Sequence, residues 1–348
     1  MDRALVLTGI RQLEFEPLPE RALAPGEVRI RTLYSGVSAG TELSQFRATS
    51  PYMSRQWDKD RRVFRDGEPS WTYPVRNLGY EEVGEIVETG SAVTQLKPGD
   101  RVFGTWGHRT GHVMSEADIG GRLMPEGADP RFGIFSHIGA VALNGVHDAR
   151  IRIGDLVVVF GLGVPGQIVV QAAHASGAKV IGVDPVPFRR QMAERMGAFR
   201  TIDPNAGSVA DLVKDGNDGL GADICIEVSG FPPALAEAMR TVAYAGRVVA
   251  MGFFQGETAG LRLGDEFHHN RIELISSQIS GVAPEASHRW SKPRLWKTVV
   301  RLQHEGRLDL LPLITDMVAF EDAPALFDRL DAGDPNILQS VLTFGDAP

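Results

Sequence analysis

The segment from Gly161 to Gly166, with the sequence GLGVPG, constrains the fold of this chain more than any other. It follows a short apolar run at 156–160 and precedes a longer apolar segment that starts at Gln167. This order is typical of a strand, a tight turn and a helix in a parallel βαβ unit. In G-x-G-x-x-G, the first glycine permits the turn, the second lets backbone N–H groups approach a pyrophosphate, and the third allows close packing of helix and strand.

An acidic residue ends the next predicted strand. Residues 179–183 read KVIGV, and Asp184 follows them. A carboxylate at this place accepts hydrogen bonds from a ribose diol and repels a 2′-phosphate. Pro165 removes one backbone N–H from the first helical turn, so we expect fewer phosphate contacts rather than loss of the site. The pattern predicts an NAD site formed by Gly161, Gly163, Val164, Pro165, Gly166 and Asp184.

The composition is that of a globular protein with more than one domain. The chain has 348 residues, of which 43% are hydrophobic and 23% are charged, and this length favours two domains. The net charge of −8 argues against nucleic acid and anionic membranes as partners and favours a small-molecule substrate. The single cysteine, Cys225, excludes an intramolecular disulfide and a multi-cysteine zinc site. With no leader pattern and no apolar run of spanning length, we expect a cytoplasmic protein.

The chain changes its pattern near Gly139. Before about residue 113, short strands alternate with proline and glycine turns, which predicts a compact β domain. After Gly139, strands alternate with helical segments, which predicts a doubly wound parallel sheet. The expected strands of that sheet are 156–160, 180–183, 224–228, 247–251 and 273–276.

A third pattern begins after Gly281. A helix is predicted near 293–305, another helix opens at Asp322, and the last strand, 339–344, has the character of the β domain. We therefore predict an α/β fold in which a Rossmann domain, 139–282, interrupts a β-rich catalytic domain made of 1–138 and 283–348. Parallel sheets of this kind bind ligands beyond the carboxyl ends of their strands, so the active site is expected in the cleft between the domains.

Residues 47–76 are locally basic and rich in aromatic side chains. We interpret this segment either as a substrate lid or as an oligomer contact, and both interpretations stay open. A lid would suit a substrate that carries a carboxylate or a flat ring. The residues concerned are Tyr52, Trp57, Phe64, Trp71 and Tyr73, interleaved with Arg47, Arg55, Lys59, Arg61, Arg62, Arg65 and Arg76.

The whole chain resembles the medium-chain dehydrogenase/reductase superfamily. The segment 39–42 (AGTE) is similar to the first catalytic loop of that family, 79–87 (GYEEVGEIV) to its glycine-histidine-glutamate strand, and 97–102 (KPGDRV) to its proline-glycine-aspartate turn. The resemblance implies a GroES-like catalytic domain and a homodimer or homotetramer. It also implies that Ser277 lies on the strand that flanks the nicotinamide. Ser229 and Gly252, which follow two of the predicted strands, are further cofactor candidates.

Arg189, five residues beyond Asp184, either reaches the adenosine ribose or is a solvated helix charge. Both interpretations of this arginine stay open.

The zinc ligands of the family are not matched here. Ala39 stands where the resemblance implies a cysteine, Tyr80 stands where it implies a histidine, and the third ligand falls near Ser136 or His137. A catalytic zinc needs three protein ligands, so we expect none. The lobe that carries a structural zinc in the family is missing too.

His108 and His112, with Glu81 or His137, are an alternative set of metal ligands. The glycines around the two histidines predict a loop, and a loop favours positions in the cleft or on the surface.

The first loop and the Gly79–Tyr80–Glu81 motif resemble the branch that contains bacteriochlorophyllide a dehydrogenase. The resemblance implies oxidation of a secondary alcohol, with hydride passing to NAD. Tyr80 is our first candidate for removing the hydroxyl proton, although its ring could instead fill the space of the missing metal. Thr41 would relay the proton, Glu81 would orient Tyr80 or a water molecule, and His108 and His137 are reserve acid–base candidates.

Two other functions compete with this hypothesis. A zinc-free quinone or enoyl reductase has the same architecture and usually takes NADPH, which the carboxylate of Asp184 disfavours. A nucleotide-binding protein that has lost its chemistry is the other alternative, because fold alone does not establish catalysis.

Overall fold

The computed structural model describes residues 2–258 and 260–345. Contacts within the chain divide it into two compact units. Unit 1 comprises residues 1–137 and 311–348, and unit 2 comprises residues 138–310. The second part of the β-rich domain was predicted to begin at 283, whereas this division has it at Leu311, so that 283–310 falls in unit 2.

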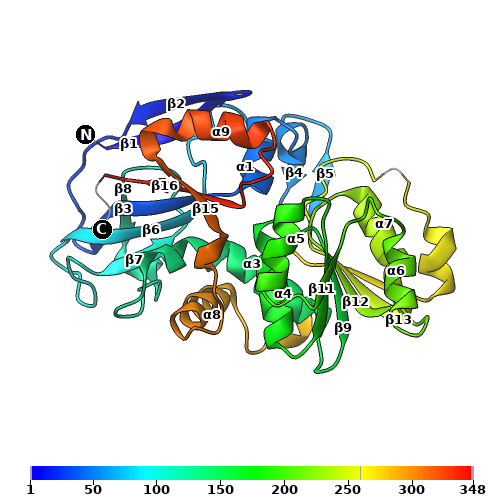
Figure 1. Ribbon diagram of the computed structural model, residues 1–348. Coiled ribbons are helices and arrows are strands. Elements are labelled where there is room, and N and C mark those ends of the chain that lie inside the picture. Colours follow the sequence, from blue (N-terminus) through cyan, green and yellow to red (C-terminus); the bar gives the residue numbers. More distant parts are fainter. Residues whose placement is uncertain (1, 259, 346–348) are drawn as a thin grey trace. The chain divides into compact units, whose positions relative to one another are not determined.

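Unit 2 is built on a six-stranded parallel sheet, in the order β11-β10-β9-β12-β13-β14. Four of these strands, β9, β11, β12 and β13, are labelled in Figure 1. The strand order runs outward from β9 in both directions, which is the doubly wound arrangement of a Rossmann fold and confirms the predicted fold class. The sequence missed only the three-residue strand β11. The strands are β9 (Leu156–Phe160), β10 (Lys179–Val183), β11 (Arg200–Ile202), β12 (Ala222–Glu227), β13 (Val242–Ala250) and β14 (Glu273–Ser276).

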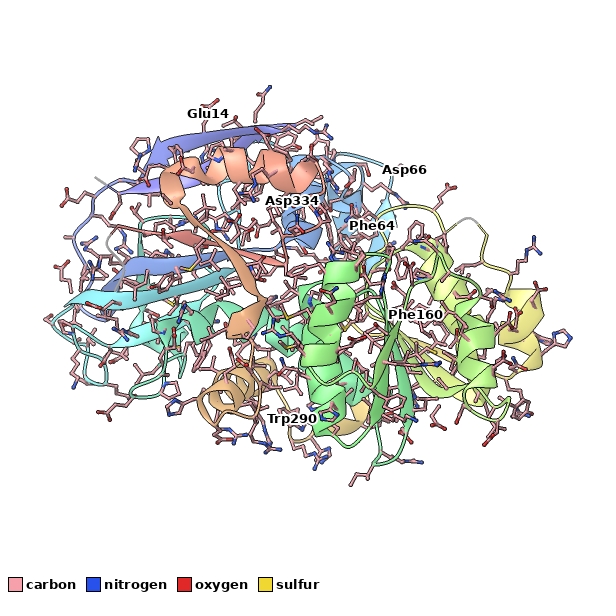
Figure 2. The ribbon with its side chains drawn as sticks, viewed as in Figure 1. Glu14, Phe64, Asp66, Phe160, Trp290 and Asp334 are labelled. Carbon is pink, nitrogen blue, oxygen red and sulfur yellow. The ribbon has the colours of Figure 1, made fainter. Side chains whose placement is uncertain are left out.

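Helices connect successive strands of this sheet from β9 to β13, and two further helices lie before β9 and after β14 in the chain. Every residue of β9 is buried, as expected of a central parallel strand, and Phe160 lies at its carboxyl end (Figure 2). Cys225 is also buried, and burial raises the pKa of its thiol, so it packs as a small apolar residue. The helices are α3 (Phe135–Ala149), α4 (Val164–Ala175), α5 (Pro187–Arg195), α6 (Val209–Asp215), α7 (Pro232–Thr241) and α8 (Lys292–His304).

Unit 1 is built on a mostly antiparallel sheet in the order β15-β16-β3-β6-β7, with β8 paired to β3. The pairing of β16 with β3 confirms that the last strand belongs to the β-rich part of the chain. The strands of this sheet are β3 (Glu27–Val37), β6 (Glu81–Thr89), β7 (Arg101–Gly104), β8 (Gly111–Ser115), β15 (Ile314–Ala319) and β16 (Gln339–Thr343).

Two hairpins and three α-helices complete unit 1. Leu326, Phe327 and Leu330 form one buried face of the last helix, α9, and they share a core with Phe46 of α1. The hairpins are β1 (Arg3–Gly9) with β2 (Gln12–Pro17) and β4 (Gln56–Asp58) with β5 (Val63–Arg65). The helices are α1 (Ala39–Phe46), α2 (Glu116–Ile119) and α9 (Ala323–Asp331).

The aromatic and basic segment 47–76 contains the β4–β5 hairpin, and its rings pack on one another. Tyr52 stacks on Trp71 with ring centroids 4.5 Å apart, and Trp57 lies 4.8 Å from Phe64, which is labelled in Figure 2. The guanidinium of Arg55 lies over Phe64 at 5.8 Å. The rings therefore stabilise the hairpin itself, and the lid and the oligomer contact both stay predictions.

None of the helices in the described part of the chain is long and apolar enough to cross a membrane.

Candidate active site and cofactor site

Three hydroxyl groups meet in unit 1. The Tyr80 hydroxyl lies 2.5 Å from Ser38 Oγ and 3.2 Å from Thr41 Oγ1. Ser38 is the N-cap of α1 and Thr41 is in the first turn of that helix, whereas Tyr80 directly precedes β6. The ring of His137 lies 4.8 Å from the Tyr80 ring. The structure thus brings together three of the predicted catalytic residues, namely Tyr80, Thr41 and His137.

The surroundings of Tyr80 keep its phenol protonated. Burial raises the pKa of Tyr80, and the hydrogen bonds with Ser38 and Thr41 offset only part of the rise. A phenol in this state is a hydrogen-bond donor to an oxygen. To act as a base it must first lose its proton, which a nearby positive charge would favour.

Glu81 and Glu82 are buried neighbours on β6, and they lie in different surroundings. Glu81 is opposite Gly36 on β3, where a Cβ on the glycine would lie 2.5 Å from Glu81 Oε2. Burial, together with the charges of Glu42 and Glu82, raises the pKa of Glu81 well above its usual value, so this carboxyl is neutral. Its Oε2 has no hydrogen-bond partner among the described residues, and the polar side chain beside it is that of Gln339.

His108 is buried, with 1% of its surface exposed, so the expectation that it lies in the cleft or at the surface is wrong. Its Nε2 is 2.7 Å from Glu42 Oε2, and its Nδ1 is 2.7 Å from Ser35 Oγ. The Ser35 hydroxyl in turn donates to Glu82 Oε1 at 3.1 Å. Strong polar partners explain why this histidine is buried although it lies beside glycines in a loop.

His112 has different neighbours from His108. It lies on β8, and its ring stacks on Trp106 with centroids 5.8 Å apart. Burial and the nearby positive charges of Arg109 and Arg21 lower the pKa of His112 to about 4. Across residues 2–258 and 260–345, no three histidine, cysteine, aspartate or glutamate residues are grouped so that they could hold a metal ion.

The donors at the position of the family's catalytic zinc do not fit that metal. Ala39 offers only a methyl group, and the Tyr80 hydroxyl already bonds with Ser38 and Thr41. A catalytic zinc needs three nitrogen, sulfur or carboxylate ligands around an open position. No reaction step at this site is therefore derived through zinc.

Sequence reasoning missed four polar residues that organise this site. Two signals could have found some of them. Consecutive glutamates in an otherwise apolar strand must place at least one carboxyl group toward the interior, and a glutamate one helical turn after an N-cap serine can accept from the backbone N–H of that serine, as Glu42 does. The missed residues are Ser35, Ser38, Glu42 and Glu82.

The glycine turn of unit 2 has the close contacts that require glycine. Gly161 has φ +90°, and a Cβ there would lie 2.8 Å from the backbone nitrogen of Ser229. A Cβ on Gly166 would lie 2.0 Å from the carbonyl oxygen of Gly161. Gly163, the N-cap of α4, has no atom within 4 Å of its Cβ position. The turn is therefore packed at its ends and open at its centre.

Val164 and Pro165 open α4, where a missing proline N–H leaves no helical hydrogen bond unmade. Asp184 follows β10 and is 3% exposed. Its two carboxylate oxygens accept hydrogen bonds from the backbone N–H groups of Leu162 and Val186, both at 2.8 Å. Arg189 Nη1 lies 3.8 Å from Asp184 Oδ2. The carboxylate is thus fixed against the glycine turn, with the guanidinium of Arg189 beside it.

The remaining cofactor candidates follow the carboxyl ends of three neighbouring strands. Ser229 follows β12, and its N–H donates to the buried Glu227 carboxyl group at 2.8 Å, as does its hydroxyl at shorter range. Gly252 follows β13 closely, and a Cβ there would lie 2.1 Å from the backbone nitrogen of Gly230. Ser277 directly follows β14. The sequence missed Glu227, which fixes the turn after β12.

Family models match most of the chain. The model for the alcohol dehydrogenase GroES-like domain matches residues 24–136, and the model for zinc-binding dehydrogenase matches residues 165–296. The chain is 34% identical to D-guloside 3-dehydrogenase of Escherichia coli K12, covering 92% of this chain and 94% of that protein. It is 27% identical to (R,R)-butanediol dehydrogenase of Bacillus subtilis, covering 90% and 91%.

Solved structures share the fold. An Escherichia coli CFT073 protein described as a short chain alcohol dehydrogenase, complexed with NADH, has a TM-score of 0.76 at 18% identity, covering 99% of both chains. The structure of 2R,3R-butanediol dehydrogenase from Bacillus subtilis has a TM-score of 0.78 at 22% identity, again over 99% of both chains.

Proposed function

Because the chain belongs to the medium-chain dehydrogenase/reductase superfamily of oxidoreductases, we propose that it moves a hydride between a secondary alcohol, or its ketone, and NAD without a catalytic zinc ion. The observation that carries the proposal is the set of hydroxyl groups around Tyr80. Tyr80 stands where the resemblance implies a zinc-ligating histidine, and the hydroxyl groups of Ser38 and Thr41 bond with it. Such a set is able to hold or transfer a proton at a substrate oxygen.

Unit 2 fits a dinucleotide. Gly163 leaves the backbone at the start of α4 open to a pyrophosphate, and Asp184 offers a fixed carboxylate to a ribose. A bound nicotinamide supplies the hydride acceptor. The carboxylate of Asp184 favours NAD over NADP, because a 2′-phosphate beside it would meet a negative charge.

The proton-handling residues of the proposal belong to unit 1. Tyr80 is the catalytic residue: its phenol donates a proton to the substrate oxygen during ketone reduction, and its phenolate takes the hydroxyl proton during alcohol oxidation. Ser38 and Thr41 hold the phenol in place, and Thr41 passes the proton onward. Glu81 is neutral, and its Oε2 has no hydrogen-bond partner among the described residues, so it is assigned no part in the proton transfer.

The names of the relatives favour a vicinal diol as substrate. D-Guloside oxidised at C3 and butane-2,3-diol both present a secondary carbinol beside another oxygen-bearing carbon. We therefore propose a small polyol or sugar-like ring, rather than a polyanion, as the substrate of this chain. A homodimer or homotetramer and a cytoplasmic location are further predictions.

Removing metal ions is the direct test of zinc independence. Incubation with a strong zinc chelator is expected to change kcat for alcohol oxidation by less than about twofold, because the residues that the structure describes include no group of zinc-type ligands. Elemental analysis of the purified protein should find zinc well below one ion per chain. A zinc-dependent dehydrogenase treated in parallel is the control. One bound zinc per chain, with activity lost on chelation and restored by zinc, would contradict the proposal.

The cofactor preference is tested at Asp184. Asp184→Asn keeps an oxygen for one backbone N–H and removes the charge, so we expect the NAD-to-NADP affinity ratio to fall by about tenfold. Fluorescence titration of both cofactors measures the ratio. Asp155→Asn is the control, because Asp155 lies at the opposite, amino end of β9. A wild-type preference for NADPH would favour the quinone or enoyl reductase, and NAD binding without turnover of an alcohol panel would favour a non-catalytic protein.

A further inference from the structure

We infer that His108 is a positioning residue: an imidazolium held between Glu42 and the Ser35–Glu82 pair, it fixes the start of α1 against the backbone that carries Tyr80. The inference rests on the proposed function, in which Tyr80 is the catalytic residue. It assigns to His108 a role other than the acid–base role expected from the sequence.

The first link runs from His108 to the hydroxyl groups of α1. His108 Nε2 lies 2.7 Å from Glu42 Oε2. The other oxygen of Glu42, Oε1, accepts a hydrogen bond from the backbone N–H of Ser38 at 2.8 Å. Ser38 and Thr41 are the two residues that bond with the Tyr80 hydroxyl, and both lie in the same helical turn as Glu42. A movement of Glu42 would move both partners of the phenol.

The second link runs from His108 to the backbone before Tyr80. A Cβ on Gly79 would lie 2.6 Å from Cε1 of the His108 ring, so the ring packs directly on this glycine. Gly79 has φ +95°, which disfavours any other residue there. The backbone N–H of His108 also donates to the carbonyl oxygen of Leu78 at 2.8 Å. His108 thus contacts the two residues that precede Tyr80.

The hydrogen-bond pattern favours an imidazolium. With the Ser35 hydroxyl donating to Glu82 Oε1, the Ser35 oxygen accepts from an N–H at His108 Nδ1. A carboxylate at Glu42 accepts from an N–H at Nε2. In this arrangement both ring nitrogens carry a proton, between two carboxyl groups that are at most 1% exposed. Burial and the charge of Arg109, the next residue along the loop, oppose this state, and the charges of Glu42 and Glu82 favour it.

Burial excludes direct contact of the His108 ring with a substrate. Both nitrogens bond inside unit 1, and Glu82 is itself fixed by the backbone N–H of Trp106 at 2.6 Å. Removing the ring would leave Glu42 as a buried charge without its cation, which strongly favours rearrangement of the α1 start. The effect on catalysis would thus pass through the geometry of Tyr80.

Kinetics of His108 and Glu42 variants test the inference. His108→Ala is expected to lower kcat for alcohol oxidation by about 10- to 100-fold and to leave the Kd for NAD within about twofold. Glu42→Gln should lower kcat in the same way, and the double variant should be no slower than the slower single variant, because both act through one link. Added imidazole should restore part of the kcat of His108→Ala. His112→Gln, which changes a histidine outside this network, is the control.

A second measurement does not depend on activity. In protein labelled with ¹⁵N-histidine, NMR should show one imidazolium with both nitrogens protonated at pH values above the ordinary histidine pKa of about 6.5, and His108→Ala should remove that signal. If His108→Ala fails to fold, the kcat of Glu42→Gln and the NMR spectrum of the wild type test the role of His108 instead. A neutral His108 ring, or full kcat in Glu42→Gln, overturns the inference. A wild-type protein that oxidises no alcohol overturns the proposed function instead, and the NMR result then shows whether the buried imidazolium exists.

Discussion

Tyr80→Phe is expected to lower kcat for alcohol oxidation by about 100- to 10,000-fold, the range typical of deleting a general acid–base group. The substitution removes one oxygen and keeps the ring that packs against His137, so the fold and the Kd for NAD should be unchanged. Steady-state kinetics with a panel of secondary alcohols and vicinal diols, together with a cofactor titration, measure both quantities.

The pH dependence of alcohol oxidation, compared between the wild type and Tyr80→Phe, tests whether Tyr80 accepts the proton. Because burial raises the pKa of Tyr80, the phenolate that accepts a proton is scarce at neutral pH. The rate of alcohol oxidation by the wild type should therefore rise as the pH increases above neutrality, and ketone reduction should not show this rise. In Tyr80→Phe, the pH dependence of oxidation due to this group should disappear.

The control for Tyr80 is an exposed tyrosine in the other unit. Tyr244, on β13, is 66% exposed, and Tyr244→Phe should leave kcat unchanged. If Tyr80→Phe instead retains kcat within about threefold, the ring only fills the space of a missing metal, and another group handles the proton.

The parts of this molecule that could be predicted from sequence depend on neighbours along the chain. The turn from β9 into α4 has its whole geometry within a few residues, so Gly161 and Gly166 indicate it directly. The last strand was assigned to the β-rich part from its own pattern, which its pairing with β3 confirms. By contrast, β11 has only three residues and no periodicity that distinguishes it from a loop.

The polar network around His108 depends on residues that are far apart in the sequence. His108 bonds with Ser35 of β3 and Glu42 of α1, and Ser35 in turn bonds with Glu82 of β6. The glycines beside His108 correctly indicate a loop, yet a loop histidine becomes buried when the fold supplies two carboxyl groups for it. Local pattern carries no information on such partners, and this is why the sequence placed His108 in a cleft or on the surface.

Gly163→Ala is expected to weaken NAD binding by about 10- to 100-fold without unfolding the protein. A methyl group at this position meets no protein atom within 4 Å, so the native fold has room for it. Gly163 is the N-cap of α4 and has no side chain to satisfy the first N–H groups of that helix, which are left for a pyrophosphate. The added methyl group would stand where the phosphates approach. An affinity loss of this size corresponds to about 1.4–2.8 kcal/mol.

Two other glycines separate a binding effect from a folding effect. Gly26→Ala in unit 1 also places its methyl group in open space, and it should change neither the Tm nor the Kd for NAD. Gly166→Ala would place its methyl carbon 2.0 Å from the carbonyl oxygen of Gly161, so it should lower the Tm as well as the affinity. Thermal unfolding and cofactor titration of the three variants give six values to compare. Wild-type affinity in Gly163→Ala would mean that the pyrophosphate does not bind at this turn, and the assignment of unit 2 as the NAD-binding unit would then be wrong.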